Sequence, residues 1–134
     1  MSVSIVRWLF CVIFTLFSFS SYAFDLSGAW TTDDSNCHKV FVTKSKKITM
    51  TRNADVFGGG FIVEGKQIRG QAKTCKITGI KEEAGVLNLV ASCSTDIAVL
   101  GTQQISIKIE GDDRVTRILP AFPEMATTYY RCKL

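Results

Sequence analysis

The stretch that decides the fold is Gln103–Leu119, which reads QQISIKIEGDDRVTRIL. In its first half three isoleucines alternate with polar residues, and this two-residue period is typical of a β-strand with one buried and one wet face. Gly111-Asp112-Asp113 then interrupts the alternation with residue types that favour tight turns. Because an extended pattern resumes at Arg114–Leu119, the segment predicts an antiparallel β-hairpin.

Short stretches of the same kind fill the chain beyond residue 23, and no helical period interrupts them. Strands are predicted at Gly28–Thr32, Lys39–Thr43, Lys47–Arg52, Phe61–Val63, Gln67–Ile77, Leu87–Cys93, Gln103–Glu110, Arg114–Leu119 and Thr127–Cys132. Turn residues separate them, with a longer turn region at Gly79–Gly85. The pattern predicts an all-β fold, a small antiparallel up-and-down β-barrel of about 8–9 strands in which neighbours along the chain pair.

The first 23 residues differ in character from the rest. Met1–Arg7 carries positive charge, an apolar run follows at Trp8–Phe19, and Ser21-Tyr22-Ala23 has the small-x-small form of a cleavage site. The run is shorter than the roughly 20 residues of a transmembrane helix. We expect residues 1–23 to be a cleaved secretory signal peptide and residues 24–134 a single β-barrel domain. The protein would then be periplasmic or secreted, without a stable membrane span after cleavage; an uncleaved N-terminal anchor is the alternative.

Charge argues against nucleic acid as a partner. The sequence has 16 Lys and Arg against 12 Asp and Glu, and loss of Arg7 with the leader lowers the formal net charge from +4 to +3. This excess is too small for the dense basic face of a nucleic-acid-binding domain.

Four cysteines lie beyond the leader, at Cys37, Cys75, Cys93 and Cys132. An even number in a short exported chain is typical of disulfides, and no CxxC pair suggests a zinc site. Three pairings are possible. The strand pattern favours Cys75–Cys93, on neighbouring antiparallel strands, with Cys37–Cys132 tying the chain ends together. On the chain-entropy model these bridges contribute about 3 and about 4.7 kcal/mol.

Few side chains suggest catalysis or metal binding. His38 is the only histidine, and nearby Asp33 and Asp34 lack a recognisable site spacing. The sequence contains no Gly-x-Ser-x-Gly elbow and no His-Glu-x-x-His motif. The acids around Gly111 are explained better by a hairpin turn than by a calcium loop. We therefore expect no enzyme activity, no cofactor and no metal site.

Motifs at the two ends of the chain carry a resemblance. Asp25-Leu26-Ser27-Gly28-Ala29-Trp30 contains Gly-x-Trp at the start of the first strand, and Tyr129-Tyr130-Arg131-Cys132 places an arginine on the last. In these features the chain resembles calycin barrels of the lipocalin and avidin type, and also small exported bacterial proteins. The resemblance implies that Trp30 plugs one end of the barrel and that Arg131 covers it in a cation–π contact.

Two apolar loops are candidates for the mouth of such a barrel. Phe57-Gly58-Gly59-Gly60-Phe61 sets two aromatic residues around three flexible glycines. A bulge or corner with both rings in the core is the favoured interpretation, and a mobile lip over the mouth is the other. Phe122 and Met125 form the second loop. If the barrel holds a ligand, Phe57, Phe61, Phe122 and Met125 are expected to line its mouth.

These patterns predict an exported, non-enzymatic binding module. Its partner would be a small apolar or amphipathic ligand, or an envelope or exported protein. The alternative is a packed barrel that acts through its surface, for instance as an inhibitor of an exported hydrolase. Lysines at the tip of the hairpin near Ser45 would suit an anionic surface, although such lysines more often keep an edge soluble. An enzyme that uses His38 as its base is the third class.

Overall fold

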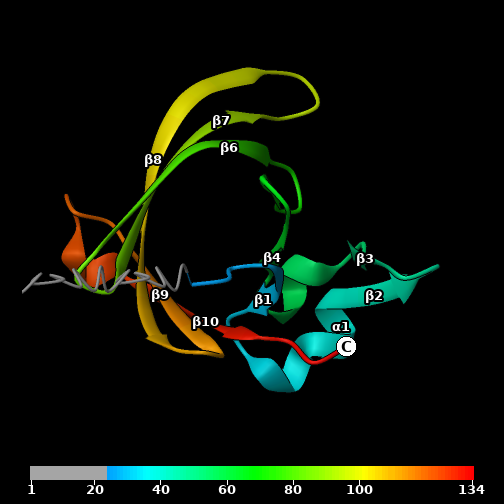
Figure 1. The fold of residues 1–134 in the computed structure, drawn as a ribbon. Coiled ribbons are helices and arrows are strands. Elements are labelled where there is room, and N and C mark those ends of the chain that lie inside the picture. The colour runs from blue at the N-terminus through cyan, green and yellow to red at the C-terminus, as the bar shows by residue number, and fades with distance from the viewer. Residues whose placement is uncertain (1–23) are drawn as a thin grey trace, which may run out of the picture.

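The computed structural model describes residues 24–134, which form a closed antiparallel β-barrel (Figure 1). Around the barrel the strand order is β1-β10-β9-β8-β7-β6-β5-β4. The bounds of these strands are β1 Gly28–Thr31, β4 Gly60–Glu64, β5 Gln67–Arg69, β6 Thr74–Glu83, β7 Val86–Ser94, β8 Val99–Gly111, β9 Arg114–Ile118 and β10 Thr127–Arg131. The predicted all-β, up-and-down barrel is confirmed. The predicted signal peptide lies outside the described residues.

One hairpin stands outside the barrel. For this part of the chain the prediction that neighbouring strands pair around the barrel is wrong. β2 (Phe41–Lys44) and β3 (Lys47–Met50) pair only with each other, and β1 pairs with β4 instead. Figure 1 shows this hairpin and α1 (Cys37–Val40) to one side of the ring of strands. Short 3-10 turns lie before α1, after β3 and before β10, at η1 Asp34–Asn36, η2 Ala54–Phe57 and η3 Pro123–Met125.

The excursion between β1 and β4 is held by a small core of its own. Val40, Phe41 and Ala54 are buried against Ala29 and Ile62, which belong to the outer face of β1 and β4. The apolar residues of the excursion therefore cover the barrel wall from outside and add no strand to it.

Two predicted strand boundaries also need correction. The predicted strand Gln67–Ile77 is two strands, β5 and β6, and β6 continues to Glu83, so that the following turn is only Ala84-Gly85. Pairing with β7 shifts by one residue between Ile77 and Gly79. Because this β-bulge breaks the two-residue alternation, the sequence pattern stops at Ile77 although the strand continues.

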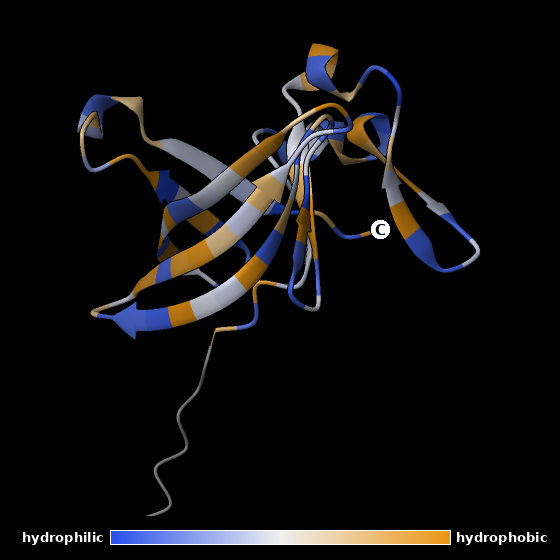
Figure 2. Cartoon of the chain, turned by 90° about the horizontal axis from the view of Figure 1, so that it is seen from above, coloured by the Kyte–Doolittle hydropathy of each residue, from blue (hydrophilic) through white to orange (hydrophobic). Residues whose placement is uncertain are grey.

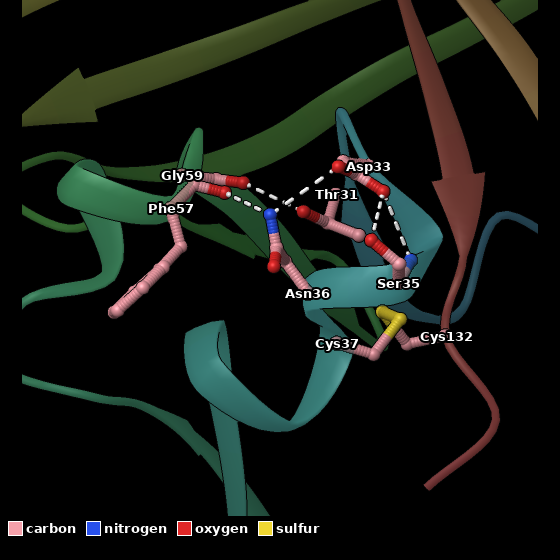
Figure 3. Close-up of a disulfide and its surroundings, with 8 residues drawn as sticks. All are labelled: Thr31, Asp33, Ser35, Asn36, Cys37, Phe57, Gly59 and Cys132. Atoms are coloured by element: carbon pink, nitrogen blue, oxygen red, sulfur yellow. Dashed lines mark hydrogen bonds between the residues drawn. A yellow bond between two sulfur atoms is a disulfide. The ribbon is translucent and has the colours of Figure 1, made fainter.

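Both predicted disulfides are present. Cys75 and Cys93 lie directly opposite each other on β6 and β7, with Cα atoms 4.0 Å apart, and are buried in the barrel interior beside Ala91. Cys37 and Cys132 have Cα atoms 5.6 Å apart and join the start of α1 to the chain just after β10 (Figure 3). One bridge thus lies inside the barrel and the other ties the outer excursion to the C-terminal end.

The main core fills the interior of the barrel. Figure 2 shows hydrophobic and hydrophilic residues alternating along the strands, as a wall with one inner and one outer face requires. The buried interior residues are Leu26, Trp30, Val63, Ile77, Leu87, Leu89, Ile107 and Val115. β1 and β4 approach so closely that a Cβ on Gly60 would lie 2.1 Å from the carbonyl oxygen of Trp30, so only glycine fits there.

Candidate functional site

The strand directions define two ends of the barrel. At one end lie residues 24–27, the turns at 65–66, 84–85 and 112–113, and the last residue of β10, Arg131. We call this the Trp30 end, because the Trp30 side chain is buried beside it. At the other end, the mouth, lie the turns at 70–73 and 95–98 and the loop 119–126.

At the Trp30 end an arginine covers an aromatic ring. The indole Nε1 of Trp30 donates to the carbonyl oxygen of Leu26 at 2.8 Å. The guanidinium carbon of Arg131 lies 4.3 Å from the centroid of the Trp30 ring. Arg131 also donates hydrogen bonds to the carbonyl oxygens of Ser27, Asp25 and Asp112, which fixes residues 25–27 across the end of the barrel. Arg131 therefore connects the Trp30 ring, residues 25–27 and the β8–β9 turn.

The carboxylate of Asp25 is held ionised in this region. Hydrogen bonds from Ser27, first of all from its backbone N–H, lower the pKa of Asp25, and the positive charge of Arg131 lowers it further. Residues 25–27 therefore present both a fixed backbone and a fixed negative charge at the Trp30 end.

An aromatic column leads from Trp30 toward the mouth. The Phe61 ring stacks on Trp30, with centroids 6.3 Å apart and planes 16° apart. Tyr129 meets Phe61 edge to face at 4.9 Å. These rings form a packed floor across the barrel.

Above this floor lies a cavity of about 170 Å³, which we call the mouth cavity. Its apolar wall is made by Phe61, Ile68, Cys75, Ile105, Ile107 and Tyr129. Gly60 and Gly70 complete the backbone around it, and Lys73 and Arg117 are its charged lining residues. The cavity thus has apolar walls and two cationic groups.

The two cations reach the cavity from β9 and from the turn before β6. Arg117 follows the buried Val115 by two positions on β9 and lies opposite Ile107, so it shares the inner face. Lys73 lies in the turn just before β6, and its Nζ donates to Oε1 of Gln103 at 3.0 Å. Both cations are half-buried.

The structure does not bring the four predicted mouth residues together. Phe61 lines the mouth cavity, whereas Phe57 packs outside the wall in the cluster around Phe41, with Nζ of Lys39 5.3 Å from its ring centroid. Figure 3 shows the Phe57 side chain pointing away from Thr31 on β1.

Phe122 and Met125 occupy the loop between β9 and β10 and are 56% and 58% exposed. Ligand contact at any of the four residues stays a prediction. Sequence reasoning missed Lys73 and Arg117; on β9 both phases hold an apolar residue, Val115 in one and Ile118 in the other, so the pattern alone does not turn Arg117 inward.

A second hollow, of about 440 Å³, lies at the Trp30 end between residues 24–27 and the β6–β7 hairpin. Its walls are largely apolar, but its ionisable lining residues are Asp25 and Glu82, both acids. Ile80 on its wall is 62% exposed. The hollow is therefore larger than the mouth cavity and opposite to it in charge.

His38 lies in neither hollow. It is exposed and borders a shallow depression of about 280 Å³, together with Asp34, Asp113 and Arg131. Within residues 24–134 no three His, Cys, Asp or Glu side chains are grouped closely enough to hold a metal ion. In the same part of the chain no helix has the length and apolar character needed to cross a membrane.

No match to this chain was found among protein-family models, curated proteins or solved structures. The barrel is therefore assigned from its topology, and any function must be argued from its own residues.

Proposed function

We propose that this protein is an exported, calycin-type barrel that binds a small ligand, with the apolar part of the ligand in the mouth cavity. The observation that carries the proposal is the cavity of about 170 Å³ above the aromatic floor of Phe61 and Tyr129. A protein cavity of about 150 Å³ with apolar walls takes up benzene, so a group of that size suits this space.

The relation to calycins is part of the proposal and is supported by Trp30 and Arg131. The closed barrel and the guanidinium over the indole ring match the form of those barrels. The two disulfides suit a non-reducing compartment, which agrees with export directed by residues 1–23.

Apolar burial alone would give weak binding. Removing roughly 100 Å² of ligand surface from water contributes about 2.5 kcal/mol, at about 25 cal/mol per Å². This corresponds to an affinity in the millimolar range or weaker. Polar contacts at the mouth must therefore supply most of the affinity and the selectivity.

The proposal is tested by NMR titration of the isotope-labelled protein with benzene. We expect the resonances of Phe61, Ile105 and Tyr129 to shift. Ile105→Trp should abolish those shifts by filling the cavity, whereas Val90→Trp should leave them unchanged, because Val90 faces outward on β7. Shifts confined to the hollow at the Trp30 end, or none at all, would refute the assignment of the site.

The alternative, a barrel that acts through its surface, is supported by a different feature. Ile97, Val99 and Leu100 at the β7–β8 turn are 97%, 85% and 44% exposed. Such an apolar tip is typical of a contact with another protein. A barrel that captures a partner through Ile97 but shows no benzene shifts inside would favour this second function.

A further inference from the structure

We infer that the mouth cavity selects a small monoanion, a carboxylate or a group of similar charge attached to an apolar part of about the size of a benzene ring. This inference rests on the proposed function and names its ligand class. It is carried by the charges of Lys73 and Arg117 inside an otherwise apolar cavity.

Arg117 is the first cation. It lies on the inner face of β9, directly opposite Ile107, which is 4% exposed. Among residues 24–134 its guanidinium has no hydrogen-bond or ion-pair partner, whereas Arg69 pairs with Glu64 and Arg131 with Asp113. Partial burial of an arginine without a counter-ion is unfavourable, and an incoming anion would remove that penalty.

Lys73 is the second cation. Its ammonium group donates to the amide oxygen of Gln103 at 3.0 Å, a neutral partner that orients the group but leaves its charge uncompensated. Within the described part of the chain, no carboxylate belongs to the cavity wall. Two like charges that face one small space raise each other's energy, and one anion between them would stabilise both.

The two hollows of the barrel would treat an anion in opposite ways. The carboxylates of Asp25 and Glu82 line the larger hollow at the Trp30 end. An anion is repelled there and attracted at the mouth, so charge alone favours one hollow over the other.

The geometry of the mouth also limits the rest of the ligand. A planar guanidinium binds a carboxylate with two parallel hydrogen bonds, which fixes the orientation of the head group. Directly below, the rings of Phe61 and Tyr129 close the cavity at its apolar end. The apolar part must therefore be compact and attached close to the charge.

Phenylacetate and phenylacetamide test this inference, because they share size and shape and differ in charge. Titrations followed by NMR should show phenylacetate binding at least about tenfold more tightly than the amide. Raising the ionic strength should weaken the binding of phenylacetate and leave that of the amide unchanged.

Substitutions of Arg117 and Lys73 test whether these two residues cause the preference for phenylacetate. Arg117→Gln and Lys73→Gln should each weaken phenylacetate binding about tenfold and leave the amide unaffected. Arg114→Gln and Lys76→Gln are the matched controls, because these exposed residues lie on β9 and β6 with the opposite phase. The controls should bind both probes like the unaltered protein.

Equal affinity for the two probes would overturn the inference and leave the proposed function intact. Unchanged phenylacetate binding by a folded Arg117→Gln variant would do the same. If phenylacetate, phenylacetamide and benzene all leave the resonances around Phe61 unshifted, both conclusions are wrong. The comparison of the two probes on the unaltered protein decides the question even if a variant fails to fold.

Discussion

Replacing Arg131 by methionine should release residues 25–27 at the Trp30 end of the barrel and lower the stability of the protein. The guanidinium donates to the carbonyl oxygens of Asp25, Ser27 and Asp112 and covers the ring of Trp30 at 4.3 Å. Methionine keeps much of the apolar stem but removes the donors and the charge. The three carbonyl groups would then have only water as a partner.

The expected loss of stability can be worked out from these contacts. A hydrogen bond that involves a charged group contributes about 1.5–3 kcal/mol, and a cation–π contact about 0.5–2 kcal/mol. The Arg131 side chain is 23% exposed, and its carbonyl partners regain water when it is removed, so these values do not add in full. We expect Arg131→Met to lower the free energy of unfolding by about 2–4 kcal/mol. Arg131→Lys keeps the charge without the planar fork and should cost about half as much.

Urea unfolding followed by tryptophan fluorescence measures this change directly. Trp30 is the only tryptophan in residues 24–134, so the fluorescence of this part of the chain reports on the Trp30 ring itself. Arg114→Met is the control, because Arg114 is exposed and has no side-chain hydrogen bond among the described residues; it should change stability by less than about 0.5 kcal/mol. If Arg131→Met unfolds at the same urea concentration as this control, the guanidinium does not stabilise the Trp30 end.

Two further predictions concern the excursion outside the barrel. Replacing both Cys37 and Cys132 by serine removes a bridge that spans 95 residues and should lower the free energy of unfolding by about 2–5 kcal/mol, measured in urea; an unchanged midpoint would contradict this. Hydrogen bonds from the Ser35 hydroxyl and backbone N–H lower the pKa of Asp33 below its ordinary 3.8. The unfolded chain therefore binds a proton at Asp33 more readily than the folded chain does. The contribution of Asp33 to stability is present above pH 3.8 and is lost as the pH falls through the folded-state pKa. The thermal midpoint should fall less on acidification in Asp33→Asn than in the unaltered protein. Superimposable curves of midpoint against pH would contradict this.

The barrel and its disulfides could be predicted because strand alternation reports directly on which residues face the core. Ile107 is buried as its pattern indicates, and Cys75 and Cys93 fall on neighbouring strands. Alternation does not report which strand becomes the neighbour. The hairpin around Ser45 has the same local pattern as the barrel strands, but Val40 and Phe41 are buried against the outside of the wall.

The candidate site was harder to predict, since small backbone changes decide which side of the wall a residue faces. Phe57 and Phe61 are four positions apart, yet Gly58 and Gly59, both with positive φ, turn the chain between them. Phe57 then joins the outer cluster and Phe61 the inner one. The sequence shows two aromatic residues around glycines, and only the paired strands show that they lie on opposite sides.

Arg117 lies on a strand whose sequence leaves its inner face undecided. On β9 the residues at Val115 and Arg117 share one phase, and Thr116 and Ile118 share the other. With an apolar residue in each phase, the alternation does not say which side is the core. Pairing of Val115 with Tyr129 and Ile109 settles it and turns Arg117 inward. A charge on the inner face contradicts the local rule for an amphipathic strand, and such departures are expected where a protein binds something. The same reasoning applies to any strand of this barrel: an inward cation without a carboxylate partner is better evidence for a ligand than an exposed aromatic loop.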